Sequence, residues 1–153
     1  MRKINKIIIH CSATPEGRDV SVDTIRKWHL KRGWRDIGYH FIIGLNGEIQ
    51  EGRPIEKTGV HTKGHNFDSI GVCYVGGVEK ERSKNGKWIA KDTRTKEQKE
   101  SLKNLLLSYK EKYKDIKIYG HRDFANKACP SFDATLEYKW ISDERNEETQ
   151  EKV

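Results

Sequence analysis

The sequence predicts an α/β fold, in which a single domain has a central mixed β-sheet flanked by α-helices. Three short apolar runs, over residues 4–9, 39–43 and 69–75, have the length and composition of buried strands. Two other segments, over 21–33 and 95–113, show the helical spacing of apolar residues. Strand and helix patterns that alternate along 153 residues are typical of one α/β domain.

The first strand and the first helix have clear boundaries in the sequence. The apolar run 4–9 ends at His10, so we expect this histidine at the end of a strand. Ser21 is a suitable N-cap, because its hydroxyl can accept a hydrogen bond from the first helical turn. Apolar residues then recur at helical spacing until Gly33. His29 lies among them, and we expect a core histidine rather than a metal ligand.

A β-hairpin is predicted next. Residues 39–43 form its first strand, and Asn46-Gly47 is a strong turn signal before the return strand 48–51. Strict alternation would place Tyr39 on the same face as Phe41. Considered by itself, Tyr39 is then an ordinary buried aromatic residue with a hydrogen-bonded hydroxyl.

Two polar segments follow, and neither has helical spacing. Residues 54–67 form a loop, because Gly59 and Gly64 disfavour a helix that would bring His61 and His65 together. We expect His65 to be exposed to solvent. The charged segment 79–93 contains an Asn-Gly turn signal, which predicts an irregular or hairpin excursion.

The clearest helix of the chain begins at Thr95, which forms a capping box with Gln98. A last short helix is predicted over 134–141, with Leu136 and Trp140 packing inward. The long helix presents one apolar stripe, which we assign to the core, made of Leu102, Leu105, Leu106, Tyr109 and Tyr113.

The chain is basic, with a net charge of +7 and a pI of about 9.3. Residues 143–153 contain five acidic and two basic residues, a net charge of −3, and we expect a flexible acidic tail there. Since the whole chain carries +7, residues 1–142 carry a net charge of +10. We assign residues 1–142 to one domain. A basic body favours an anionic partner, either nucleic acid or the bacterial wall, or serves solubility alone.

Reactive side chains are concentrated in residues 120–130, between a glycine that allows a sharp turn and a proline that stops a helix. They are the imidazole of His121, the amine of Lys127 and the thiol of Cys129. Together with His10, they include the imidazole and thiolate ligands that zinc takes. The spacing matches no compact zinc finger, so composition alone favours a buried thiol and two polar loop histidines.

Seven sequence blocks add information that composition does not contain: residues 9–14 (IHCSAT), 25–29 (IRKWH), 33–34 (GW), 38–43 (GYHFII), 69–73 (SIGVC), 75–77 (VGG) and 127–133 (KACPSFD). In this order, the blocks resemble the zinc-dependent N-acetylmuramoyl-L-alanine amidases, and among them the small lysozymes of the bacteriophage T-seven type. The resemblance extends to about residue 141. Seven colinear blocks are a specific signal, whereas a single Lys-x-Cys-Pro would be a weak one.

This resemblance implies the fold shared by these amidases and the peptidoglycan-recognition proteins. It implies hydrolysis of the amide bond between N-acetylmuramic acid and L-alanine in bacterial peptidoglycan. It also implies one zinc ion per chain, held by His10, His121 and Cys129. The family places a catalytic tyrosine, or a glutamate in other branches, at the position of Tyr39. Lys127 is close enough in sequence to Cys129 to stabilise the oxyanion of an amide under attack.

The resemblance leaves the details of substrate contact less well defined. His61 and Asn66 match family positions near the bound peptidoglycan stem, so we expect both residues to bind substrate. A zinc with three protein ligands lowers the pKa of a bound water to about 7. Tyr39 could orient that water, donate to the oxyanion or pass a proton, and the sequence does not choose among these roles.

Three alternatives belong to other classes of protein. The first is a non-catalytic peptidoglycan-binding module on the same fold, although such modules typically lack the cysteine ligand that is present here as Cys129. The second is a nucleic-acid-binding protein, which the basic charge favours, but no recognised nucleic-acid motif is present. The third is a cysteine hydrolase, which is disfavoured because Pro130 has no backbone N–H to donate to an oxyanion.

The sequence also suggests a cellular setting. It shows neither a secretory signal nor an apolar run of membrane-spanning length, and three cysteines without a Cys-x-x-Cys pair predict no disulfide framework. We therefore expect a monomer made in the cytoplasm, which acts on the wall after release by a holin or another export route. A lysozyme of the T-seven type also binds its phage's RNA polymerase, but no motif here supports that partner.

Overall fold

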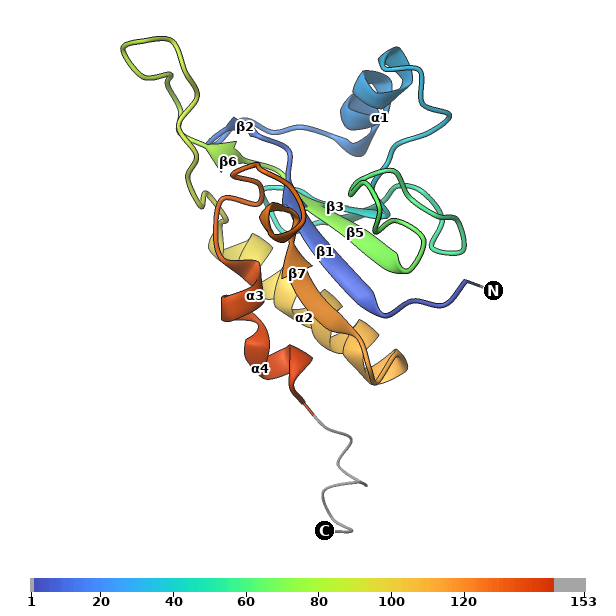
Figure 1. The fold of residues 1–153 in the computed structure, drawn as a ribbon. Helices are drawn as coiled ribbons and strands as arrows, with labels where there is room; N and C mark the ends of the chain where they lie inside the picture. Colours follow the sequence, from blue (N-terminus) through green and yellow to red (C-terminus); the bar gives the residue numbers. More distant parts are fainter. Residues whose placement is uncertain (1, 145–153) are drawn as a thin grey trace.

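A computed structural model describes residues 2–144 and shows a five-stranded sheet with helices on both sides (Figure 1). Its strands are β1 (Lys6–Cys11), β3 (Phe41–Ile43), β4 (Ile49–Glu51), β5 (Ser69–Tyr74) and β7 (Lys117–Gly120). The spatial order is β4-β3-β5-β1-β7, with four parallel strands and β4 as an antiparallel edge. The predicted mixed sheet is therefore confirmed. A second, two-stranded sheet pairs β2 (Thr14–Pro15) with β6 (Gly77–Val78).

Two helices begin directly after their predicted N-cap residues. Ser21 accepts a hydrogen bond from the backbone N–H of Thr24, and Thr95 and Gln98 form both bonds of the capping box. The helices are α1 (Val22–Lys31), α2 (Lys96–Lys112), α3 (Ala134–Glu137) and α4 (Lys139–Ser142), and a 3₁₀ turn, η1 (His121–Asp123), follows β7.

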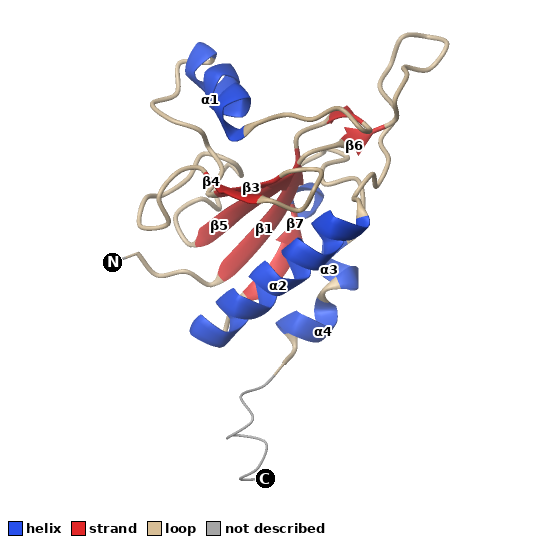
Figure 2. Cartoon of the chain, turned by 180° about the vertical axis from the view of Figure 1, so that it is seen from behind, coloured by secondary structure: helices blue, strands red, loops and turns tan. Residues whose placement is uncertain are grey.

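The two faces of the sheet bury different side chains. Helices α2, α3 and α4 cover one face, and α1 lies on the other side (Figure 2). Along β1, Ile7 and Ile9 belong to the cluster under α2, so the intervening Ile8 and the following His10 point to the α1 face. The predicted stripe of α2 is confirmed as core, with Leu102 fully buried.

Tyr39 lies on the face opposite to the one predicted. Strand β3 begins only at Phe41, so the two-residue alternation does not extend back through the irregular residues 38–40. Phe41 and Ile43 pack with the α2 cluster, whereas Tyr39 packs with Ile42 in the α1 cluster. Tyr39 therefore shares a face with His10, which matters for the site below.

The last predicted helix is divided into α3 and α4 at Tyr138, and this break changes which residues face inward. Leu136 and Trp140, which were predicted to be buried, are 68% and 55% exposed. Tyr138 and Ile141 are buried in their place. The prediction was wrong because a single helical period does not continue across the break.

The segment after β6 is a hairpin that projects from the body (Figure 1). The backbone N–H of Glu79 donates to the carbonyl of Ile89, and that of Ser83 to the carbonyl of Lys87. The predicted hairpin excursion is thus confirmed, and Trp88 is exposed on it.

The predicted acidic tail, residues 143–153, lies outside the described residues except for residues 143 and 144. Within residues 2–144, none of the helices has the length and apolar character needed to cross a membrane.

Candidate metal centre

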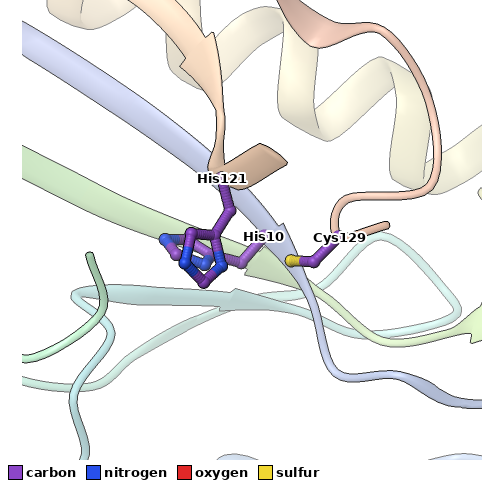
Figure 3. Close-up of side chains that lie close together, drawn as sticks. All are labelled: His10, His121 and Cys129. Carbon is purple, nitrogen blue, oxygen red and sulfur yellow. The ribbon is translucent and has the colours of Figure 1, made fainter. Parts of the chain in front are cut away.

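Two parallel strands and one loop bring three possible ligands together. His10 lies next to the end of β1, and His121 is the first residue of η1, directly after β7. Because β1 and β7 are parallel neighbours, their carboxyl ends meet at the same edge of the sheet. Cys129 reaches this edge from the loop after η1 (Figure 3). The three ligand atoms lie within 4.8 Å of one another, which is close enough for one ion to contact all three.

Both histidines of this cluster are neutral near pH 7. His10 is 1% exposed, and burial is the main reason that its pKa lies well below the ordinary value. The neighbouring charges of His61, His121 and Lys127 lower the pKa of His10 further. Burial, followed by the charge of Lys127, also lowers the pKa of His121. A neutral imidazole is the form that binds a metal ion.

The sulfur of Cys129 is held by backbone contacts. The N–H of Cys11 donates to Sγ of Cys129 at 3.2 Å, and the N–H of Arg122 donates to the carbonyl of Cys129 at 2.8 Å. The contact with the Cys11 thiol, followed by burial, raises the pKa of Cys129. The metal-free thiol therefore keeps its proton at neutral pH, and metal binding releases that proton.

The loop that carries Cys129 returns closely against the end of β7. A Cβ atom added at Gly120 would lie 2.9 Å from Cδ of Pro130, so the glycine permits this approach. The Cys129–Pro130 peptide bond is cis. The hydroxyl of Tyr74 donates to the carbonyl of Pro130 at 2.6 Å, which ties the loop to β5.

The predicted catalytic residues lie beside the ligands. The ring of Tyr39 is 5.0 Å from that of His10. Burial raises the pKa of Tyr39, so its phenol remains a hydrogen-bond donor at neutral pH. Lys127 is exposed, and its charge contributes to the lowered pKa of both His10 and His121.

The structure places His61 directly behind His10, with Nδ1 of His61 2.9 Å from Nε2 of His10. Asn66 organises the same loop, because its Oδ1 accepts from the backbone N–H groups of His61 and Thr62 at 3.0 and 2.8 Å. The predicted contacts of His61 and Asn66 with substrate stay predictions. Thr62, whose Oγ1 is 3.3 Å from Nε2 of His10, was not predicted, because a threonine in a polar loop has no distinguishing signal.

The sequence also led to predictions for two other histidines, His29 and His65. His29 is a core residue, as predicted, and its Nδ1 accepts from the backbone N–H of Gly38 at 2.9 Å. His65 was predicted to be exposed, and this was wrong. It is half-buried, with its ring 4.1 Å from that of Phe124, because the loop 54–67 meets the loop after η1.

Comparison with known families decides the class of this site. The profile of one protein family, described as N-acetylmuramoyl-L-alanine amidase, matches residues 1–132, which include all three possible ligands. The chain belongs to the N-acetylmuramoyl-L-alanine amidase family. In this amidase, two imidazoles and one thiol form a donor set that suits zinc, and three protein ligands are typical of a catalytic zinc site.

Known relatives agree with this assignment. The endolysin of Escherichia phage T7 is 45% identical to this amidase over 127 residues, which cover 83% of the chain and 80% of the phage protein. The N-acetylmuramoyl-L-alanine amidase LysC from Clostridium intestinale URNW superimposes with a TM-score of 0.72 at 28% identity, covering 89% of this chain and 82% of that one. Bumblebee PGRP-SA gives a TM-score of 0.72 at 26% identity, covering 91% and 82%. The predicted fold is confirmed.

Proposed function

We propose that this amidase hydrolyses the amide bond between N-acetylmuramic acid and L-alanine in bacterial peptidoglycan, with one zinc ion held by His10, His121 and Cys129. The observation that carries the proposal is the convergence of these three ligand atoms at one edge of an amidase-family sheet. The T7 relative is named an endolysin, which supports the bacterial wall as the target. Synthesis in the cytoplasm, release by a holin and a monomeric state stay predictions.

The chemistry of the three side chains fits zinc. His10 and His121 offer neutral nitrogens, and Cys129 offers a sulfur that loses its proton on binding. When bound, zinc supplies a Lewis acid for the carbonyl oxygen and lowers the pKa of a bound water to about 7.

Tyr39 and Lys127 supply the remaining polar groups. The raised pKa of Tyr39 favours a hydrogen-bond donor over a general base, so we assign its hydroxyl to orienting the water or holding the carbonyl oxygen. Lys127 is exposed, and we assign its charge to stabilising the negative oxygen that develops during attack.

A non-catalytic peptidoglycan-binding module is the alternative, and the similarity to PGRP-SA supports it. The complete set of two histidines and one cysteine favours the enzyme, because a binding module needs no metal ligands. The position of Cys129 among these ligands also disfavours a cysteine hydrolase, in which the thiol would act as a nucleophile.

Mass spectrometry of purified peptidoglycan, after incubation with the protein, tests the proposed reaction. We expect free stem peptides that begin with L-alanine. These peptides should disappear when a zinc chelator is added and return when zinc is restored. If zinc-loaded protein leaves several types of wall uncut, the amidase proposal fails and the binding module is favoured. Cleaved glycan chains with intact amide bonds would instead indicate a glycosidase.

A further inference from the structure

We propose that His61 is a positioning residue, which fixes the tautomer and the orientation of His10 so that His10 binds the metal through Nδ1. This inference rests on the metal site proposed above. Nε2 of His10 lies 2.9 Å from Nδ1 of His61 and 3.3 Å from Oγ1 of Thr62. Nε2 is therefore occupied on the protein side, and Nδ1 is the nitrogen left for the ion.

The hydrogens of these rings can be assigned from the contacts. Two ring nitrogens that face each other bond only when one carries a hydrogen and the other a lone pair. If Nε2 of His10 carries the hydrogen, its Nδ1 has the free lone pair that a metal needs. His61 then accepts at Nδ1 and carries its own hydrogen on Nε2, which is 3.2 Å from Oγ of Ser69. One donor chain thus runs from His10 through His61 to Ser69.

The ring of His61 is held in a slot between two glycines. A Cβ atom at Gly71 would lie 2.6 Å from Cγ and Cδ2 of His61, and one at Gly59 would lie 2.8 Å from Cδ2. A larger residue at either position would displace the ring. Asn66 fixes the backbone on the same loop through its two accepted hydrogen bonds. Such a rigid support is what a residue that orients a metal ligand requires.

The same contacts argue against a direct role of His61 in binding the peptidoglycan stem. Nδ1 faces His10 and Thr62, and Nε2 faces Ser69, so both ring nitrogens already have partners within the protein. The ring has no further polar atom to offer a substrate. Replacing His61 should therefore act on zinc affinity and on the orientation of His10, and through these two on hydrolysis.

The test compares two substitutions at one position. His61→Phe fills the slot without an acceptor, whereas His61→Asn offers an amide oxygen near the place of Nδ1. In competition with a chelator, we expect zinc affinity to fall about 10- to 100-fold in His61→Phe and to recover largely in His61→Asn. The matched control His65→Phe changes a histidine of the same loop that contacts Phe124, and it should leave zinc affinity unchanged.

A second measurement separates positioning from a general structural role. The visible absorption of the cobalt-substituted protein should change in His61→Phe, because the ligand field depends on the orientation of His10. At saturating zinc, KM should stay near that of the wild type while kcat falls. Unchanged zinc affinity and an unchanged cobalt spectrum, together with a raised KM, would overturn the proposal and return His61 to substrate binding.

A variant that preserves shape covers the case in which His61→Phe does not fold. The double variant Ser69→Ala, Thr62→Val removes two hydrogen-bond partners of the rings and is expected to weaken zinc binding several-fold. Zinc affinity equal to that of the wild type in this variant would also overturn the proposal. If the wild-type protein itself binds no zinc, the proposed metal site fails, which is a separate and recognisable outcome.

Discussion

The two faces of the central sheet differ in what they bury. The face under α2 is filled with isoleucine and leucine side chains, such as Ile9 and Leu106, whose packing does not depend on protonation. The face toward α1 buries imidazoles, including His10, His29 and His40, each of which needs a neutral ring and a matched hydrogen bond. The apolar cluster under α2 and the imidazoles beside the possible metal ligands thus lie on opposite sides of one sheet, so a truncation under α2 should leave the metal site intact.

The largest effect should come from Cys129→Ser, which removes the only sulfur from the ligand set. Zinc should no longer bind stoichiometrically, because a neutral hydroxyl is a poor zinc ligand. Release of stem peptides should fall to the level of chelator-treated wild type, and His121→Ala should behave in the same way. Metal analysis and mass spectrometry measure both quantities. Wall lysis with stoichiometric zinc in either variant would refute the ligand assignment.

Leu106→Ala tests the apolar face of the sheet, which α2 covers. Leu106 is a fully buried residue of α2 that packs toward the sheet, so its truncation should lower the free energy of unfolding by about 2–5 kcal/mol. Urea unfolding of the metal-free protein measures this loss. Zinc affinity of the folded variant should match that of the wild type. A fall in zinc affinity as large as the fall in stability would show that the two faces are not independent.

Lys127→Ala tests a residue of the proposed site that is not a metal ligand. Lys127 is exposed and outside the ligand set, so the variant should keep its zinc. Loss of the charge that we assign to the oxyanion should lower kcat about 100-fold or more. Steady-state kinetics measure kcat, and metal analysis of the same preparation measures the bound zinc. Loss of zinc from this variant would contradict the assigned role.

The smallest expected effect is a dependence of stability on pH. Nδ1 of His29 and Nδ1 of His40 accept from the N–H groups of Gly38 and Gly71, and burial lowers the pKa of each ring to about 4. The unfolded chain, with a histidine pKa near 6.5, binds more protons between these values. Stability is therefore complete above about pH 6.5 and is lost as the pH falls toward 4.

The loss should be on the order of 1 kcal/mol per ring by pH 5, after allowance for solvent screening. Urea unfolding of metal-free protein at pH 7 and pH 5 measures it. The additional loss in Leu106→Ala should be the same at both pH values, because burial of that side chain does not involve protons. A stability that is equal at the two pH values would refute the neutral state of these rings.

Sequence periodicity predicted the α2 face better than the α1 face. The capping box at Thr95 and the stripe through Leu102 are local signals, and both were confirmed. The proposed ligand set came from the family resemblance, which joined His10 and His121 to Cys129, and His10 also follows a predicted strand. The geometry of this cluster agrees with that proposal.

The errors have a common physical origin. Tyr39 and Trp140 were placed by extending a regular period beyond a point where the backbone leaves its strand or helix. The partial burial of His65 and the contact of His61 with His10 depend on how closely distant loops approach each other. For His61, the absence of side chains at Gly59 and Gly71 permits that approach, and a glycine in a sequence does not reveal what will occupy the space.

The distance along the chain between the ligands has a consequence for protein synthesis. The N–H of Cys11 and the sulfur of Cys129 are 118 residues apart in sequence, and β1 also needs β7 as its second neighbour. A ribosome therefore makes His10 well before Cys129, and the proposed ligand set is incomplete until Cys129 has been translated. Every nascent chain that stops before residue 129 lacks the sulfur. With the ligand set proposed above, a chain that ends before residue 129 should show no wall-cutting activity.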